Sequence, residues 1–300
     1  MPDFTGPMQP WPALEPFARR VELPRQGLTL FTYEAGDPAA PPALLIHGLG
    51  DEADTWRGLI PRLAVTHRVI APDLPGFGRS DQPKVAYTPA YHQQALSELM
   101  DVLALDKVRL LGNSLGGMLA HSLTLKQPQR VARLALLDGS LAAGGGRPSL
   151  GQLLFALPLA GEYLYNRLRK DPDAAYASLR PFYFDLDALP QADQAFLYQR
   201  VNERVWSDGQ RRAYFSTLRS AAFWQRRMQK GLDTLLAAVA TPTLAIWGEA
   251  DQIVSPAGGQ TVAQMQPNAR LITIARAGHL PQQERPDAVM EALAHSWLAP

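Results

Sequence analysis

The 300-residue sequence contains no cysteine. It therefore cannot form disulfide bonds, bind a metal through thiolates or use a cysteine nucleophile. Long hydrophobic runs are also missing, because no stretch reaches the roughly 18 apolar residues of a membrane span. The proline-containing segment Met1–Arg20 lacks the apolar run that a signal peptide requires. We expect a cytoplasmic protein that makes no membrane contact.

An excess of charge of either sign is missing as well. The 29 Lys and Arg residues nearly balance 28 Asp and Glu residues, for a net charge of +1. Nucleic acid and anionic membranes need a concentrated basic surface, so neither is an expected partner. No His or carboxylate cluster has metal-ligand spacing, and we predict no metal and no cofactor. The expected partner is a small-molecule ester substrate, bound by a monomer or a homodimer.

Short apolar runs alternate with segments of helical spacing along most of the chain. This alternation is typical of strands and crossover helices in a mainly parallel α/β sheet. Amphipathic helices are predicted over Thr88–Leu103 and Leu115–Lys126, where apolar residues recur at three- and four-residue steps. The predicted strands are Leu28–Ala35, Ala43–His47, Arg68–Pro72, Val108–Gly112, Val131–Leu137, Thr243–Trp247 and Leu271–Ile274.

One section interrupts the alternation. Residues 140–230 contain no convincing strand but several helical stretches, introduced by the glycine-rich linker 142–146. We predict a helical cap over residues 140–230, inserted into a core domain that comprises residues 1–139 and 231–300. The insertion holds more than half of the chain's Phe, Tyr and Trp residues. These side chains either fill the core of the cap or give apolar walls to a cleft.

The segment Gly112-Asn113-Ser114-Leu115-Gly116 follows a predicted strand and opens a predicted helix. In this context a serine lies on a sharp, strained turn, and the glycines let strand and helix approach closely. The same pattern also fits a glycine-rich turn with an incidental serine. Its placement between strand and helix favours Ser114 as a nucleophile.

A serine hydroxyl needs a general base within hydrogen-bond reach. His279, in Ala277–Pro281, follows the last predicted strand and is the best candidate of the six histidines. By contrast, His92 and His121 lie within helical patterns and are expected to be surface or packing residues. We predict that His279 is the base.

The base in turn needs a carboxylate that orients it. Asp251 lies on the loop after the strand that begins at Thr243, at the sheet edge where open α/β sheets bind ligands. The order Ser114, Asp251, His279 is the order in which an α/β sheet of this type delivers a triad. Glu249 and Asp138, which ends an earlier strand, remain alternative acids.

The tetrahedral intermediate of acyl transfer needs donors for its oxyanion, and backbone N–H groups on glycine-rich turns supply them. Leu115, next to the predicted nucleophile, offers one such group. The segment His47–Gly50 follows another predicted strand and offers a second, with the N–H of Leu49 as the first choice. The same glycines also fit a tight turn with positive φ, and the two interpretations are compatible.

Together these segments resemble the α/β-hydrolase superfamily over nearly the whole chain. The resemblance comprises the His47-Gly48 turn, the Asp73–Ser80 segment, the serine turn, the Asp251 loop and the Gly278-His279 loop. It implies a mostly parallel eight-stranded sheet flanked by helices, with a helical cap over the active site. It also implies hydrolysis of carboxylic esters with small to medium acyl or aryl groups, through an acyl-enzyme on the serine.

Other activities fit the same resemblance. Carbon–carbon bond hydrolases of ring-cleavage (meta-cleavage) products resemble this chain at Gly112-Asn113-Ser114, but they typically carry tryptophan immediately after the catalytic histidine. Here Leu280 and Pro281 follow His279, as in many esterases, and this difference favours ester hydrolysis. Further alternatives are a cofactor-free haloperoxidase and a non-catalytic ligand-binding module.

Overall fold

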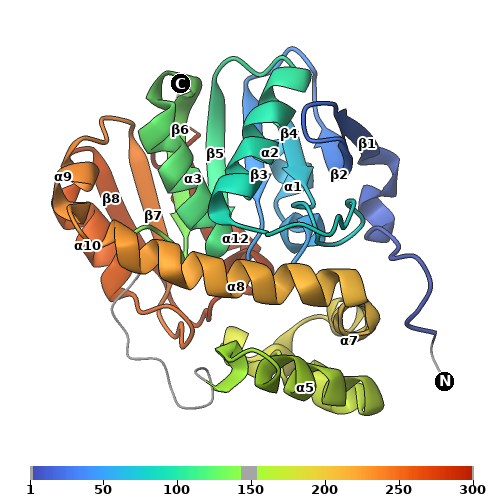
Figure 1. The fold of residues 1–300 in the computed structure, drawn as a ribbon. Helices are drawn as coiled ribbons and strands as arrows, with labels where there is room; N and C mark the ends of the chain where they lie inside the picture. The colour runs from blue at the N-terminus through green and yellow to red at the C-terminus, as the bar shows by residue number, and fades with distance from the viewer. Residues whose placement is uncertain (1–2, 143–153, 299–300) are drawn as a thin grey trace.

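The computed structural model describes residues 3–142 and 154–298, and it contains one eight-stranded sheet with the strand order β1-β2-β4-β3-β5-β6-β7-β8 (Figure 1). Pairing is parallel from β4 to β8, and β2 runs antiparallel to both β1 and β4. The strands are β1 (Ala18–Leu23), β2 (Leu28–Ala35), β3 (Pro42–Ile46), β4 (Arg68–Pro72), β5 (Val108–Asn113), β6 (Val131–Leu137), β7 (Thr243–Gly248) and β8 (Ala269–Ile274).

The predicted fold class is confirmed, and every strand except β1 lies within two residues of its predicted position. β1 was missed because it is an edge strand with the sequence ARRVEL, in which only Val21 and Leu23 are buried. β7 is buried along its whole length. Strands covered on both faces have continuous apolar sequences, whereas an edge strand carries charged residues and is harder to predict from its sequence.

Two hydrophobic layers lie on opposite faces of the sheet. Leu44 and Ile46 of β3 pack in one layer with α2, α3, α10 and α8 (Asp208–Met228). Their neighbours Ala43 and Leu45 pack in the other with α1 and α12, because successive strand residues point to opposite faces. The core helices are η1 (Pro12–Phe17), η2 (Ala53–Trp56), α1 (Ile60–Leu63), α2 (Pro89–Val102), α3 (Leu115–Lys126), η3 (Pro128–Arg130), α9 (Leu232–Ala237), α10 (Ala257–Met265), α11 (Pro281–Glu284) and α12 (Pro286–Ala294).

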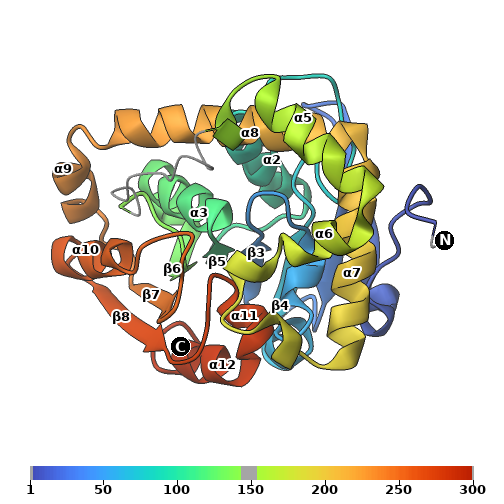
Figure 2. The same ribbon diagram turned by 90° about the horizontal axis from the view of Figure 1, so that it is seen from below.

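The described part of the predicted cap is helical. Figure 1 shows α8 crossing the edge of the sheet at which the parallel strands end, with α5 beyond it, and Figure 2 looks onto this edge. The cap boundaries stay a prediction, and the part of the predicted glycine linker after Ala142 lies outside the described residues. The elements are α5 (Ala160–Arg167), η4 (Leu168–Lys170), α6 (Pro172–Ala177), η5 (Arg180–Phe182), η6 (Leu186–Ala188), α7 (Gln191–Trp206) and α8 (Asp208–Met228).

None of the helices in the described residues combines the length and the apolar character that crossing a membrane demands.

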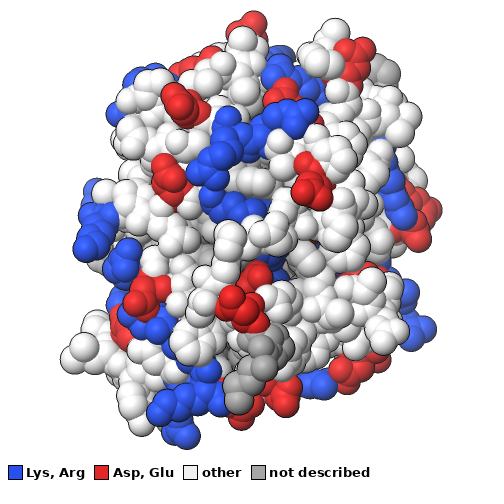
Figure 3. All heavy atoms as spheres, turned by 90° about the vertical axis from the view of Figure 1, so that its right-hand side faces the viewer, with Lys and Arg blue, Asp and Glu red and all other residues white. Residues whose placement is uncertain are grey.

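A hollow of about 660 Å³ lies on the side of the molecule that Figure 3 shows. The N-terminal segment, β1 and the end of α7 border it, and its basic lining residues are Arg19, Arg20 and Arg79. Arg79 is held in ion pairs with Asp54 and Asp73. None of the described residues that line the hollow is a predicted catalytic residue, so it lies apart from the predicted chemistry.

Candidate active site

Ser114 occupies the sharp turn between β5 and α3, as predicted. Its backbone has φ 54° and ψ −119°, a conformation that non-glycine residues rarely adopt. The flanking glycines permit this turn. A Cβ on Gly116 would lie 2.0 Å from the carbonyl oxygen of Ile46, and one on Gly112 would lie 2.3 Å from the carbonyl oxygen of Gly116. Strand, turn and helix therefore fit together only with glycine at both positions.

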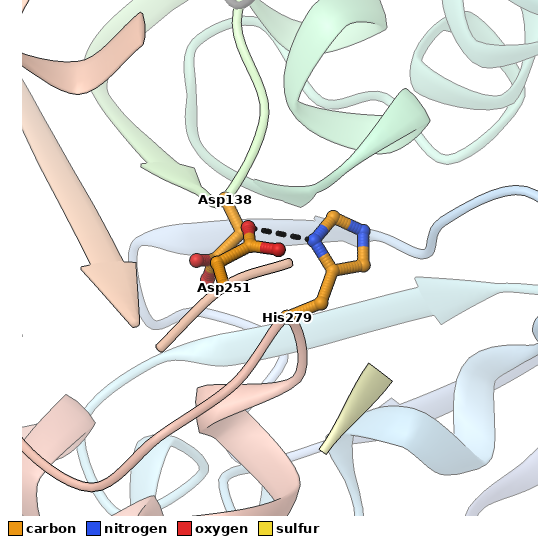
Figure 4. Close-up of side chains that lie close together, drawn as sticks. All are labelled: Asp138, Asp251 and His279. Carbon is orange, nitrogen blue, oxygen red and sulfur yellow. Dashed lines mark hydrogen bonds and ion pairs between the residues drawn. The ribbon is translucent and has the colours of Figure 1, made fainter. Parts of the chain in front are cut away.

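His279 and Asp251 form the predicted acid–base contact. Nδ1 of His279 donates to Oδ2 of Asp251 over 2.9 Å, and both side chains are buried (Figure 4). Oδ1 of Asp251 accepts from the backbone N–H groups of Ile253 and Val254, at 2.8 and 3.0 Å. Donation from Nδ1 leaves Nε2 of the neutral ring as an acceptor. This arrangement can take a proton from a nucleophile.

Asn113 joins the serine turn to the histidine loop, a contact that the sequence did not reveal. Its Nδ2 donates to the carbonyl oxygens of His279 and Leu137, at 3.1 and 3.2 Å. Asn113 is fully buried. Because it directly precedes Ser114, this amide fixes the spacing between the candidate nucleophile and the candidate base.

The cap also holds the histidine loop. The N–H of His279 donates to the carbonyl oxygen of Phe182 over 2.8 Å. The carboxylate of Glu284 accepts from the N–H groups of Gly278 and Phe184, at 2.7 and 2.8 Å. Burial raises the pKa of Glu284 in spite of these donors. The sequence did not identify Glu284, since no short motif surrounds it.

Within the described residues, neither of the two alternative acids forms a hydrogen bond or an ion pair with the histidine ring. Glu249 is exposed. Asp138 is fully buried beside Asp251, and one of its oxygens accepts from the N–H of Gly248 over 2.7 Å. Burial, followed by the charge of Asp251, raises the pKa of Asp138 well above its usual value of 3.8. The carboxylate that bonds His279 is Asp251.

Asp138, Asp251 and His279 each offer one possible metal-ligand atom, and these three atoms lie within 4.8 Å of one another. In the described part of the chain this is the one group of three His or acidic side chains with metal-binding proximity, and the spacing in the sequence did not indicate it. Asp251 and His279 already bond each other, and a cation would have to displace that bond. The geometry therefore suits acid–base chemistry better than metal binding.

The predicted oxyanion donors lie on the segments expected for them. A Cβ on Gly48 would come within 3.2 Å of the Cβ of Ser114, so the turn that carries Leu49 packs against the serine. Leu115 is the first residue of α3. Across residues 3–142 and 154–298, neither the N–H of Leu49 nor that of Leu115 donates to a protein acceptor. Both are free to bind an anion, and their role stays a prediction.

His47 supports this turn and takes no part in the acid–base contact. Its Nε2 accepts from the N–H of Leu74 over 2.8 Å, so the ring proton lies on Nδ1, which donates to the carbonyl oxygen of Gly48 over 2.7 Å. Both ring nitrogens are thereby occupied. The histidine of the His47-Gly48 motif thus shapes the backbone next to Leu49.

A buried ionic cluster joins the segment after β3 to the cap. Arg204 of α7 donates to Glu52 at 2.7 and 2.8 Å and to Asp51 at 2.5 Å. The carboxylates of Glu52 and Asp51 raise the pKa of Arg204 against the effect of burial. Arg200, also on α7, lies 3.3 Å from Glu52. No local pattern in the sequence indicates these contacts, because the partners are about 150 residues apart.

Aromatic side chains of the cap reach the site from two elements. The ring of Tyr214 in α8 lies so close to Gly50 that a Cβ there would be 2.9 Å from it. The ring of Phe182 lies 6.0 Å from that of His279. Other cap aromatics pack on one another, as Tyr165 does on Phe215. Packing within the cap, one of the two predicted roles, is therefore present, and the role as walls of a cleft stays a prediction.

Comparisons with known proteins agree with this architecture. The model of the family described as alpha/beta hydrolase fold matches residues 41–286. A 2-hydroxy-6-oxononadienedioate/2-hydroxy-6-oxononatrienedioate hydrolase of Dechloromonas aromatica is 30% identical, over 84% of this chain and 86% of its own. An uncharacterized protein of Mycobacterium tuberculosis, Rv2715, is 30% identical, over 83% of this chain and 72% of its own. The structure of the 2-hydroxy-6-oxo-6-phenylhexa-2,4-dienoate hydrolase from Rhodococcus sp. strain RHA1 is 26% identical, with a TM-score of 0.76 and coverage of 94% and 98%.

Proposed function

The chain belongs to the α/β-hydrolase fold family, and from this premise we propose that it is a serine hydrolase. Its nucleophile is Ser114, its general base is His279 and its acid is Asp251. The buried bond between Nδ1 of His279 and Asp251 supports this assignment, because it leaves Nε2 unprotonated and ready to accept a proton. The N–H groups of Leu49 and Leu115 stabilise the oxyanion. The substrate is a small molecule, and hydrolysis needs only water besides it.

The bond that we propose is cleaved is a carbon–carbon bond next to a ketone, in a 2-hydroxy-6-oxo-dienoate formed by ring cleavage. The observation that carries this choice is the agreement among relatives: the named hydrolases that resemble this chain at 28–30% identity, over 84–89% of its length, act on such dienoates by name. The sequence alone favoured an ester, and the relatives favour the alternative.

The candidate site can carry out this reaction. Ser114 Oγ attacks the ketone carbon while His279 takes its proton, and the carbon–carbon bond then breaks as the oxyanion collapses. For this to occur, the 2-hydroxydienoate must first move its hydroxyl proton to C5 and become a 2-oxo-enoate. The electron pair released at C5 then passes through the enone to the 2-oxo group, and the leaving group takes the proton that His279 had accepted from Ser114. Water releases the acyl group from Ser114 as a carboxylic acid, so one water is consumed in total. The conjugated acid is essential because an unconjugated carbanion is a very poor leaving group.

Leu280 supports ester hydrolysis as a second candidate function. Ring-cleavage hydrolases that resemble this chain typically have tryptophan at this position, whereas here Leu280 packs with Tyr183 and Leu186 of the cap. The same three catalytic residues would cleave an ester through the same acyl-enzyme. In that case the substrate has a small to medium acyl or aryl group, since aromatic cap residues border the site.

A substrate panel separates the two functions. The protein would be assayed with 2-hydroxy-6-oxo-6-phenylhexa-2,4-dienoate and with p-nitrophenyl esters from acetate to palmitate, and the Ser114→Ala variant would give the background. We expect kcat/KM for the dienoate to exceed that for the best ester by about tenfold or more, equivalent to about 1.4 kcal/mol of transition-state stabilisation. The reverse ranking would assign the protein as an esterase. Turnover of neither, without labelling of Ser114 by a fluorophosphonate, would favour a ligand-binding module.

A further inference from the structure

Two acidic side chains lie side by side next to His279. β6 and β7 are adjacent parallel strands, and Asp138 directly follows β6 while Asp251 lies on the loop after β7. Figure 4 shows the two carboxyl groups together on one side of the histidine ring. Their oxygens and a ring nitrogen of His279 lie within 4.8 Å of one another. Asp138 has no exposed surface, so bulk water does not screen its charge.

The two carboxyl groups have unequal hydrogen-bond partners. Asp251 accepts three hydrogen bonds, from Ile253, Val254 and His279. Asp138 accepts one at Oδ1, from the N–H of Gly248. Its Oδ2 is buried and has no donor among the described residues, although the carboxyl group faces Asp251. Two carboxyl oxygens can form a direct hydrogen bond with each other only if one of them carries a proton.

Like charges at this separation, away from water, cannot both persist. The anion resides on Asp251, because three donors stabilise it there and a single donor serves Asp138. We propose that Asp138 is a positioning residue whose protonated carboxyl donates a hydrogen bond to Asp251 and thereby holds Asp251 in line with His279. This inference rests on the proposed triad and assigns Asp138 a role that differs from that of triad acid.

The charged groups around Asp138 keep the proton in place. Asp251 from the loop after β7 and Glu284 from α11 both raise the pKa of Asp138, in addition to burial. His279, on the loop after β8, is a further titratable neighbour, and it is already bonded to Asp251. As the pH rises through the pKa of Asp138, a second negative charge appears beside Asp251. Repulsion then breaks the contact, and the orientation of His279 is lost.

Two variants distinguish the effect of the hydrogen bond between Asp138 and Asp251 from the effect of ionising Asp138. Asp138→Asn keeps a donor for Asp251 and an acceptor for Gly248 but cannot ionise. Asp138→Gly removes both groups. Asp138 has φ 48°, which asparagine tolerates and glycine adopts freely, so neither change strains the backbone.

The readout is the second-order rate constant for labelling of Ser114 by a fluorophosphonate, measured from about pH 5 to about pH 10. Labelling forms the Oγ–P bond and releases fluoride, and it reports triad activation whatever the natural substrate is. Infrared difference spectroscopy of the protonated carboxyl C=O stretch gives an independent readout. It compares the full-length protein with each variant and needs no catalysis.

We expect the wild-type rate to fall on the alkaline side, and the Asn variant to match it at neutral pH without that fall. The Gly variant should label about 10- to 100-fold more slowly at neutral pH, the effect of losing a hydrogen bond to a charged group. A protonated-carboxyl band should be present in the wild type and absent from both variants. An identical alkaline fall in the Asn variant, or equal rates for Asn and Gly, would overturn the proposal. A wild type that is not labelled at all would refute the proposed triad, and the infrared band would still decide whether Asp138 carries the proton.

Discussion

The carboxyl edge of the sheet and the helical cap hold their functional side chains by different means. At the sheet edge, backbone groups position the side chains. Glycines let Ser114 approach the neighbouring strand, and N–H groups orient Asp251. In the cap, long side chains hold one another in place, through ion pairs such as that of Arg204 with Glu52 and through aromatic contacts. The proposed catalytic residues thus lie in short motifs, whereas the cap is held by contacts between residues that are far apart in the sequence.

This difference predicts how each region responds to mutation. A change at the sheet edge removes a reacting group or its support and should alter the rate while leaving the fold intact. A change at the ionic cluster leaves carboxylates buried without a partner and should alter stability first.

Ser114→Ala should lower kcat about a thousandfold or more, and His279→Ala should do the same, because nucleophile and base act as one unit. The double variant should be no slower than either single variant. The matched control is thermal unfolding, which should occur at nearly the wild-type temperature. Retained turnover in Ser114→Ala would remove the central assignment.

Asp251→Asn should cost less than the loss of Ser114, about a hundredfold to ten-thousandfold in kcat. The asparagine amide would donate towards Nδ1 of His279 and favour the tautomer that cannot act as a base. Asp138→Asn is the matched comparison, because it makes the same change on the neighbouring carboxyl. A larger loss in Asp138→Asn would identify Asp138 as the triad acid.

Arg204→Met should destabilise the protein by about 3 kcal/mol, because it strands the buried Asp51 and Glu52 carboxylates. Chemical denaturation would measure the change in the free energy of unfolding. The control is Arg180→Met, which removes an exposed partner of Asp187 in the same cap and should leave that free energy nearly unchanged. Equal effects of the two substitutions would show that the cluster does not join the cap to the core.

The sequence predicted those features of the molecule that follow from a local pattern of residues. Ser114, Asp251 and His279 each follow a strand that the sequence predicted, so their common sheet edge could be predicted. Asn113 lay within a predicted motif, but its amide contact with the His279 loop spans 166 residues and has no local signature.

Two histidines also show that a local pattern does not identify tertiary contacts. His92 and His121 were expected to be surface or packing residues, and both are fully buried. Burial lowers the pKa of His92 to about 3 and that of His121 to about 4, so both side chains are uncharged at neutral pH. His92 contacts Thr217 of α8 over 3.1 Å. Helical spacing could identify the face on which a residue lies, but the element that covers that face comes from the tertiary fold.

The smallest predicted effect is a pH-dependent gain in stability in Asp138→Asn. The pKa of Asp138 is raised in the folded protein, so its favourable contribution is complete below the unfolded value near 3.8 and is lost as the pH rises through the folded value. The asparagine variant loses nothing over this range. Its melting temperature relative to wild type should therefore increase with pH, by about 2–4 °C for each kcal/mol that the wild type loses. Calorimetry of both proteins at matched pH values would measure the difference. All other titrating groups, including Glu284, are common to the two proteins and cancel. A melting-temperature difference that is constant above pH 4 would mean that Asp138 ionises at its ordinary pKa, and the proton that we place between the two carboxyl groups would then be absent at neutral pH.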